Sequence, residues 1–231
     1  MNRTIGRSVF GEPLHAFFFP ETSQSPVLVL AGIHGDEPKS VTVATRLREA
    51  LSSDRSQAVG EAHWIVVPVA NPDGYALRRR GNANRVDINR NFPTENWERS
   101  SKRSRMFGGD EPASEPETKA LIGLIEQTQP VAIISIHSID QHRHCNNYDG
   151  PAEELAHAMA AANAYPVRGS IGYPTPGSLG TWAGIERGIP VVTLELPSHH
   201  SPKKCWQDNH GALYACAEFS SRHQKSSCHM P

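Results

Sequence analysis

Four short apolar runs, well separated along the chain, constrain its fold more than any other feature of the sequence. They cover residues 27–30, 64–69, 131–136 and 191–196, and each is typical of a buried strand. Helical spacing or helix-start signals follow at about 38–52, 118–127, 153–164, 178–187 and 207–223. Strands separated by helices predict an α/β fold with a mainly parallel mixed sheet and helices on both faces.

The length of 231 residues and the 38% share of hydrophobic residues suit one domain with a full core. No internal repeat or linker is visible, so we expect residues 1–231 to form a single domain with a polar tail from about residue 220. The net charge of −1 gives no global reason to expect nucleic acid as a partner. Recognition of an anionic ligand must therefore be local.

The sequence also indicates a compartment. It contains no apolar run of about 18 residues, so we expect no transmembrane helix and no membrane partner. The N-terminus lacks the features of a secretory signal, and the four cysteines are far apart with no CxxC pair. We therefore expect free thiols and a cytoplasmic location. Nothing in the sequence indicates the oligomeric state.

Three residues near the predicted strand ends have the chemistry of a metal site. His34 and Glu37 form an HxxE pair after the first apolar run, and His137 directly follows the third. Two imidazoles and one carboxylate can hold zinc with a position left open. An HxxE pair alone is weak evidence, because a turn histidine beside a helix-starting glutamate has the same pattern. His137 alone also suits a hydrogen-bonded core histidine.

Glu195 lies inside the fourth apolar run, where a carboxylate is costly to bury unless a charge or metal compensates it. The alternative is a strand whose Glu195 face meets solvent. A carboxylate near zinc can accept a proton from bound water, whose pKa the metal lowers from about 15.7 towards 7. Ligands of open α/β sheets bind at the carboxyl ends of the strands, so we expect Glu195 near His34, Glu37 and His137.

The chain from about residue 75 to 113 is a long polar excursion, of a kind that is usually functional or disordered. Asn89, Arg90 and Arg80 lie in it. Guanidinium groups match carboxylates geometrically, so one arginine can hold a substrate carboxylate while the other faces the oxyanion of a tetrahedral intermediate.

Together these motifs resemble the zinc carboxypeptidase family. The match runs in family order through HxxE, Asn71-Pro-Asp-Gly74, Val86-Asp-Ile-Asn-Arg-Asn91, Ser135-Ile-His-Ser138 and Thr193-Leu-Glu195. The resemblance implies that one Zn²⁺ is bound by His34, Glu37 and His137. It also implies that Glu195 is the general base and acid.

The same resemblance implies roles on the substrate side. Asn89 and Arg90 would bind the terminal carboxylate of the substrate, and Arg80 would polarise the scissile carbonyl. Tyr173 corresponds to the mobile tyrosine of the family, and Ser178 begins the stretch that lines the pocket for the released residue. That stretch carries no aspartate, so it does not resemble a pocket built for a lone lysine or arginine side chain.

The compact chain and the run from Arg80 to Pro93 most resemble family members that act on cell-wall peptides. This implies a small peptide substrate, murein tripeptide, and hydrolysis of its γ-D-glutamyl–meso-diaminopimelate bond during cytoplasmic cell-wall recycling. Diaminopimelate leaves with a free α-carboxylate beside the scissile amide, as in a carboxypeptidase step. The alternatives are an ordinary metallocarboxypeptidase, an N-acyl amino acid deacylase, or, in another class, a non-catalytic ligand-binding protein.

Overall fold

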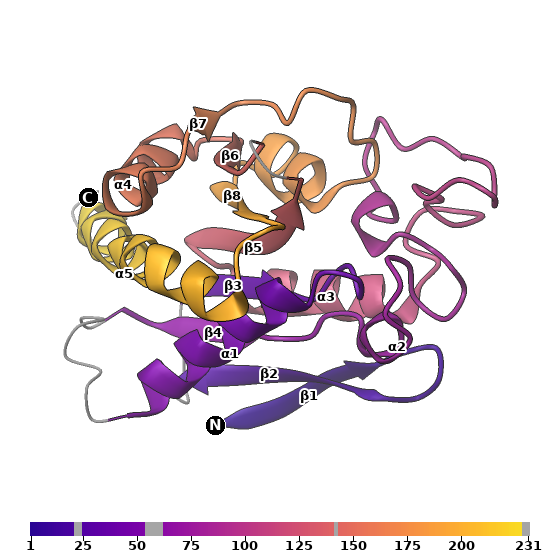
Figure 1. The fold of residues 1–231 in the computed structure, drawn as a ribbon, viewed down its shortest axis with the longest axis horizontal. Helices are drawn as coiled ribbons and strands as arrows, with labels where there is room; N and C mark the ends of the chain where they lie inside the picture. Colours follow the sequence, from indigo (N-terminus) through magenta and orange to yellow (C-terminus); the bar gives the residue numbers. More distant parts are fainter. Residues whose placement is uncertain (21–24, 54–61, 141–142, 228–231) are drawn as a thin grey trace.

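The computed structural model describes residues 1–20, 25–53, 62–140 and 143–227, with side chains described to residue 219. Among these residues, eight strands form one sheet in the order β1-β2-β4-β3-β5-β8-β6-β7 (Figure 1). The four central strands are parallel: β4 (Trp64–Val67), β3 (Val27–Ala31), β5 (Ala132–Ile139) and β8 (Val191–Pro197). They correspond to the four apolar runs.

The edges of the sheet make it mixed. On one edge, the hairpin of β1 (Asn2–Arg7) and β2 (Pro13–Phe19) pairs antiparallel with β4. On the other edge, β6 (Cys145–Asp149) runs antiparallel to β8, and β7 (Val167–Arg168) runs parallel to β6. The predicted mainly parallel mixed sheet is therefore confirmed, although these four strands were not predicted.

Helices cover both faces of the sheet, as predicted (Figure 1). One face packs against α1 (Pro38–Ser52), α4 (Glu153–Asn163) and α5 (Pro202–Ser227). The other face packs against α3 (Pro116–Thr128) and the π-helix η3 (Gly180–Ile185). Alternate residues of β3 enter opposite cores, with Val27 and Val29 in the first and Leu28 and Leu30 in the second. This double burial explains why the central strands are continuously apolar.

The remaining predictions concern the ends of elements and the cysteines. The helix expected at 178–187 is the shorter π-helix η3, and α5 keeps a helical backbone to Ser227. Cys145, Cys205 and Cys216 are free and buried, whereas Cys228 lies outside the described residues. In the described part of the chain, no helix is both long and apolar enough to cross a membrane.

Candidate metal centre and pocket

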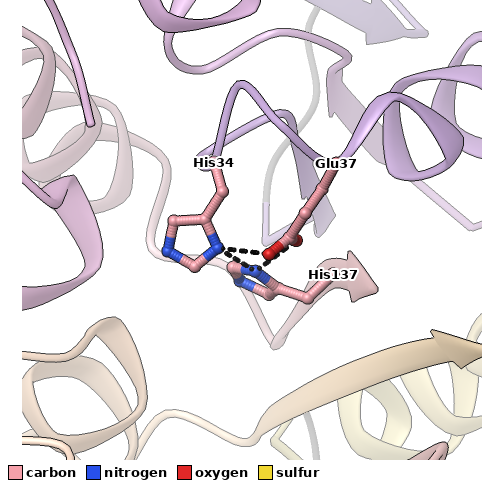
Figure 2. A group of neighbouring side chains, drawn as sticks. All are labelled: His34, Glu37 and His137. Carbon is pink, nitrogen blue, oxygen red and sulfur yellow. Dashed lines mark hydrogen bonds and ion pairs between the residues drawn. The ribbon is translucent and has the colours of Figure 1, made fainter. Parts of the chain in front are cut away.

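The three candidate metal ligands converge beside the carboxyl ends of neighbouring parallel strands. His34 and Glu37 lie in the turn between β3 and α1, and His137 lies in β5. Figure 2 shows the three side chains pointing toward one another. His34 Nδ1 is 2.8 Å from Glu37 Oε1, and His137 Nδ1 is 3.1 Å from both His34 Nδ1 and Glu37 Oε2. These separations approach the roughly 3.3 Å between ligand atoms of a tetrahedral zinc ion, so the donor set fits zinc.

Two turns lock together to place these residues. A Cβ on Gly35 would lie 1.9 Å from the carbonyl carbon of Gly74, so only glycine fits at position 35. The Asn71 side chain accepts a hydrogen bond from Gly74 N and donates to the carbonyls of Ile33 and Arg80. The Asn71-Pro-Asp-Gly74 turn after β4 thereby supports the metal-binding turn after β3. The short helix α2 (Pro72–Ala76) begins in this turn.

Each histidine uses its second ring nitrogen for another polar partner. His34 Nε2 donates to Oδ1 of the fully buried Asp87 at 3.1 Å, and His137 Nε2 lies 3.0 Å from Ser135 Oγ. Such partners fix the tautomer and the ring orientation in metal sites. Asp87 was not singled out by sequence analysis, although its position two residues before Asn89 was an available signal.

Glu195 faces this group from β8. It is paired with His137 in the register of β5 and β8, and it is 6% exposed. The alternative of a solvent-facing Glu195 is therefore wrong. Burial and the negative charge of Glu37 raise the pKa of Glu195 to about 8. A cation bound beside it would oppose this shift.

The histidines and carboxylates of the group also perturb one another. Burial alone would lower the pKa of His34, but Glu37 and Asp87 outweigh it and raise that pKa to about 9. Burial alone would raise the pKa of Glu37, but His34 and His137 hold it well below its usual range. The group therefore holds Glu37 and Asp87 ionised beside a protonated His34. Because metal ligands must be deprotonated, a divalent cation bound here would displace the His34 proton.

Two arginines of the polar excursion lie in different surroundings. Arg80 Nε donates to Asp87 Oδ2 at 2.8 Å, and its Nη1 lies 3.7 Å from Glu37 Oε1. Arg90 is buried in the short helix η2 (Ile88–Arg90) and makes no ion pair with a carboxylate in the described residues. Its Nη1 donates to the carbonyl of Asn89, and its Nε has no hydrogen-bond partner among them. Arg90 is therefore a buried cation available for an anionic ligand.

The predicted substrate-side residues lie on the loop leading into η3 and beside it. The Asn89 side chain accepts a hydrogen bond from Leu179 N at 2.9 Å, which ties η2 to η3. The Ser178 hydroxyl accepts one from Thr181 N at 3.1 Å. Tyr173 is partly exposed, and the guanidinium carbon of Arg143 lies 5.7 Å from the centre of its ring.

One pocket of about 470 Å³ brings all the predicted site residues together. Its lining includes His34, Glu37, Arg80, Asn89, Arg90, His137, Tyr173, Ser178 and Glu195. Their chemical roles stay predictions. The wall also contains Arg143 and Asp149, which sequence analysis did not single out because neither belongs to a matching motif.

The fold and the His–Glu–His group define a metallopeptidase site, and residues 2–207 match the family described as zinc carboxypeptidase. The chain belongs to the zinc carboxypeptidase family. It is 37% identical to murein peptide amidase A of Escherichia coli K12, over 95% of this chain and 89% of that protein. It is 35% identical to murein peptide amidase A of Vibrio campbellii, over 84% and 78%. The crystal structure of murein-tripeptide amidase from E. coli O157 matches it with a TM-score of 0.74 and 33% identity, covering 95% and 91%.

Proposed function

We propose that this protein is a zinc-dependent amidase that hydrolyses the γ-D-glutamyl–meso-diaminopimelate bond of murein tripeptide in cytoplasmic cell-wall recycling. The observation that carries the proposal is the similarity to murein peptide amidase A over nearly the whole chain. The free thiols of Cys145, Cys205 and Cys216 suit a reducing compartment.

His34, Glu37 and His137 would hold one Zn²⁺ and leave a coordination position open. When bound, zinc lowers the pKa of a water molecule and polarises the scissile carbonyl. Asp87 and Ser135 contact the other ring nitrogens of the two histidines, so that each Nδ1 faces the Glu37 carboxylate.

Glu195 accepts the proton of the attacking water and then delivers a proton to the leaving amine. A pKa raised by burial, and opposed by a nearby cation, brings this carboxylate towards the neutral range in which one group can both accept and donate. Arg80, held in place by Asp87, donates to the carbonyl oxygen as negative charge develops there.

Arg90 supplies the carboxypeptidase-like character of the site. Its buried guanidinium has no carboxylate partner in the part of the chain that the structure describes, so a carboxylate of the substrate would form an ion pair with it. In murein tripeptide this is the α-carboxylate of diaminopimelate, next to the scissile amide. Asn89 and Tyr173 line the same pocket, and Tyr173 would close over the bound residue.

The first test is hydrolysis of L-Ala-γ-D-Glu-meso-diaminopimelate by the purified, zinc-loaded protein, measured as free diaminopimelate by chromatography. We expect release that a chelator abolishes and zinc restores. Cleavage of α-linked peptides in its place would support an ordinary metallocarboxypeptidase, and cleavage of N-acyl amino acids would support a deacylase. Hydrolysis of none of these would favour the non-catalytic ligand-binding protein.

Two variants separate the roles of base and ligand. Glu195→Gln should keep zinc and lose about 10²- to 10⁴-fold in kcat, because a general base is worth that much. His137→Ala should lose zinc as well, as measured by metal content after dialysis. Normal turnover by Glu195→Gln would contradict the mechanism.

A further inference from the structure

Asp149, the last residue of β6, places a carboxylate in the pocket wall against the π-helix η3. A Cβ on Gly180 would lie 2.2 Å from Asp149 Oδ2, and a Cβ on Gly184 would lie 2.9 Å from the Asp149 side chain. The two glycines of η3 therefore leave the room that this carboxylate occupies. A π-helical turn is rare and is frequently found at functional sites.

Within the described part of the chain, no cationic side chain neutralises Asp149. None of the described lysine, arginine or histidine side chains forms an ion pair with it, and the Asn147 amide donates a hydrogen bond to its Oδ2 at 3.4 Å. Burial raises the pKa of Asp149 to about 6. A partly buried carboxylate without a compensating charge is costly for folding, and a cationic ligand in the pocket would offset that cost.

Arg143 contributes the opposite charge to the same pocket. Its Nη2 donates to the carbonyl of Ile171 at 2.6 Å, and its guanidinium lies near the ring of Tyr173. Within the described residues, no carboxylate forms an ion pair with Arg143. The pocket wall thus includes one carboxylate, Asp149, and one guanidinium group, Arg143, neither of which forms an ion pair within the described residues.

We infer that Asp149 binds an ammonium group and Arg143 a carboxylate at the far end of the released residue's side chain, so that the pocket selects a zwitterionic terminus. The inference rests on the proposed function, because the side chain of diaminopimelate ends in a carbon bearing both groups. Arg90 holds the α-carboxylate at the reacting end, and Ser178 and Thr181 line the space beside η3. Residues 178–182 contain no aspartate, but the pocket still has a carboxylate in its wall, because Asp149 comes from β6.

Three substrates test each charge separately. They are L-Ala-γ-D-Glu peptides ending in meso-diaminopimelate, in L-lysine, which lacks the distal carboxylate, and in L-2-aminopimelate, which lacks the distal ammonium. For the wild type, we expect kcat/KM to fall at least about 10²-fold for either analogue, because each leaves one charged group of the pocket without its partner.

Two variants assign each loss to its residue. Asp149→Asn should remove the preference for meso-diaminopimelate over 2-aminopimelate, and Arg143→Gln should remove the preference over lysine. Glu126→Gln and Arg46→Gln are the matched controls, because each removes a charge of the same sign from an exposed face of α3 or α1. Both control variants should keep the two substrate preferences of the wild type. Thermal melting of each variant checks its folding.

The outcomes distinguish this inference from the proposed function. The inference is overturned, and the proposed function stands, if the wild type hydrolyses the tripeptide while both variants keep the wild-type substrate preferences. The two variants are Asp149→Asn and Arg143→Gln. A wild type inactive on all three substrates overturns both. The same three terminal residues can also be compared as free amino acids that inhibit the wild type competitively: meso-diaminopimelate, L-lysine and L-2-aminopimelate. Equal inhibition by all three would also overturn the inference.

Discussion

Asp87→Asn is the most informative single perturbation of the site, because one buried carboxylate supports two different functions. Asp87 accepts hydrogen bonds from His34 Nε2 at 3.1 Å, from Arg80 Nε at 2.8 Å and from Asn89 N at 3.0 Å. Asparagine is nearly isosteric but removes the charge, and its amide cannot accept at both oxygen positions. The substitution therefore loosens a candidate metal ligand and the candidate oxyanion donor together.

The expected magnitudes follow from these contacts. Loss of the carboxylate partner of a metal-binding histidine lowers metal affinity about 10- to 100-fold. Misplacing an oxyanion donor costs about 10²- to 10³-fold in kcat, and this loss should persist at saturating zinc. Competition with a chromophoric chelator measures the first effect, and tripeptide hydrolysis at saturating zinc measures the second.

Ser135→Ala is the matched control, because Ser135 contacts the second nitrogen of His137 and not Arg80. We expect it to weaken zinc binding while kcat at saturating zinc stays close to that of the wild type. If Asp87→Asn keeps both zinc affinity and kcat within about twofold of the wild type, the reasoning from its buried contacts is refuted.

Three further predictions concern stability. Stripping zinc should lower Tm by about 5 to 10 °C when the metal had been about 100-fold above its Kd, and His34→Ala should show no such shift in calorimetry. Asp149→Asn should raise the free energy of unfolding by about 2 kcal/mol at pH 7.5 and leave it nearly unchanged below about pH 4. The folded pKa of about 6 lies above the unfolded value, so the folded wild type binds more protons and loses stability as pH rises through this window; equal urea midpoints at pH 7.5 would contradict the assignment. Gly35→Ala should prevent stable folding, because its Cβ would meet the Gly74 backbone, whereas Gly123→Ala in α3 has open space and should stabilise by about 0.5 to 1 kcal/mol in chemical unfolding.

The sequence predicted the centre of the sheet well and its edges poorly, for a physical reason. The central strands are buried on both faces and therefore form continuous apolar runs. Strand β6, next to the edge strand β7, reads Cys-Asn-Asn-Tyr-Asp, and asparagine and aspartate are depleted in strands generally. Its polar side chains instead face the pocket and neighbouring amides, which only the tertiary structure shows.

The same contrast holds for the candidate site. His34, Glu37, His137 and Glu195 were found because they follow or interrupt apolar runs at strand ends. Asp87, Arg143 and Asp149 were not, since their significance depends on what each side chain meets across the fold. For Asp149 in particular, nothing within β6 indicates that two glycines of η3 pack against its side chain.

The register between β5 and β8 has a consequence for how the site can be altered. His137 and Glu195 are direct neighbours in two parallel strands, so the backbone hydrogen bonds of the sheet set their spacing. Loops around the pocket can therefore be lengthened, shortened or exchanged without changing the distance between these two residues. Deleting one residue within either strand would turn the side chains on one side of the deletion to the opposite face of the sheet. An engineer seeking a new substrate should redesign the segments bearing Arg143 and Tyr173 and leave the lengths of β5 and β8 untouched.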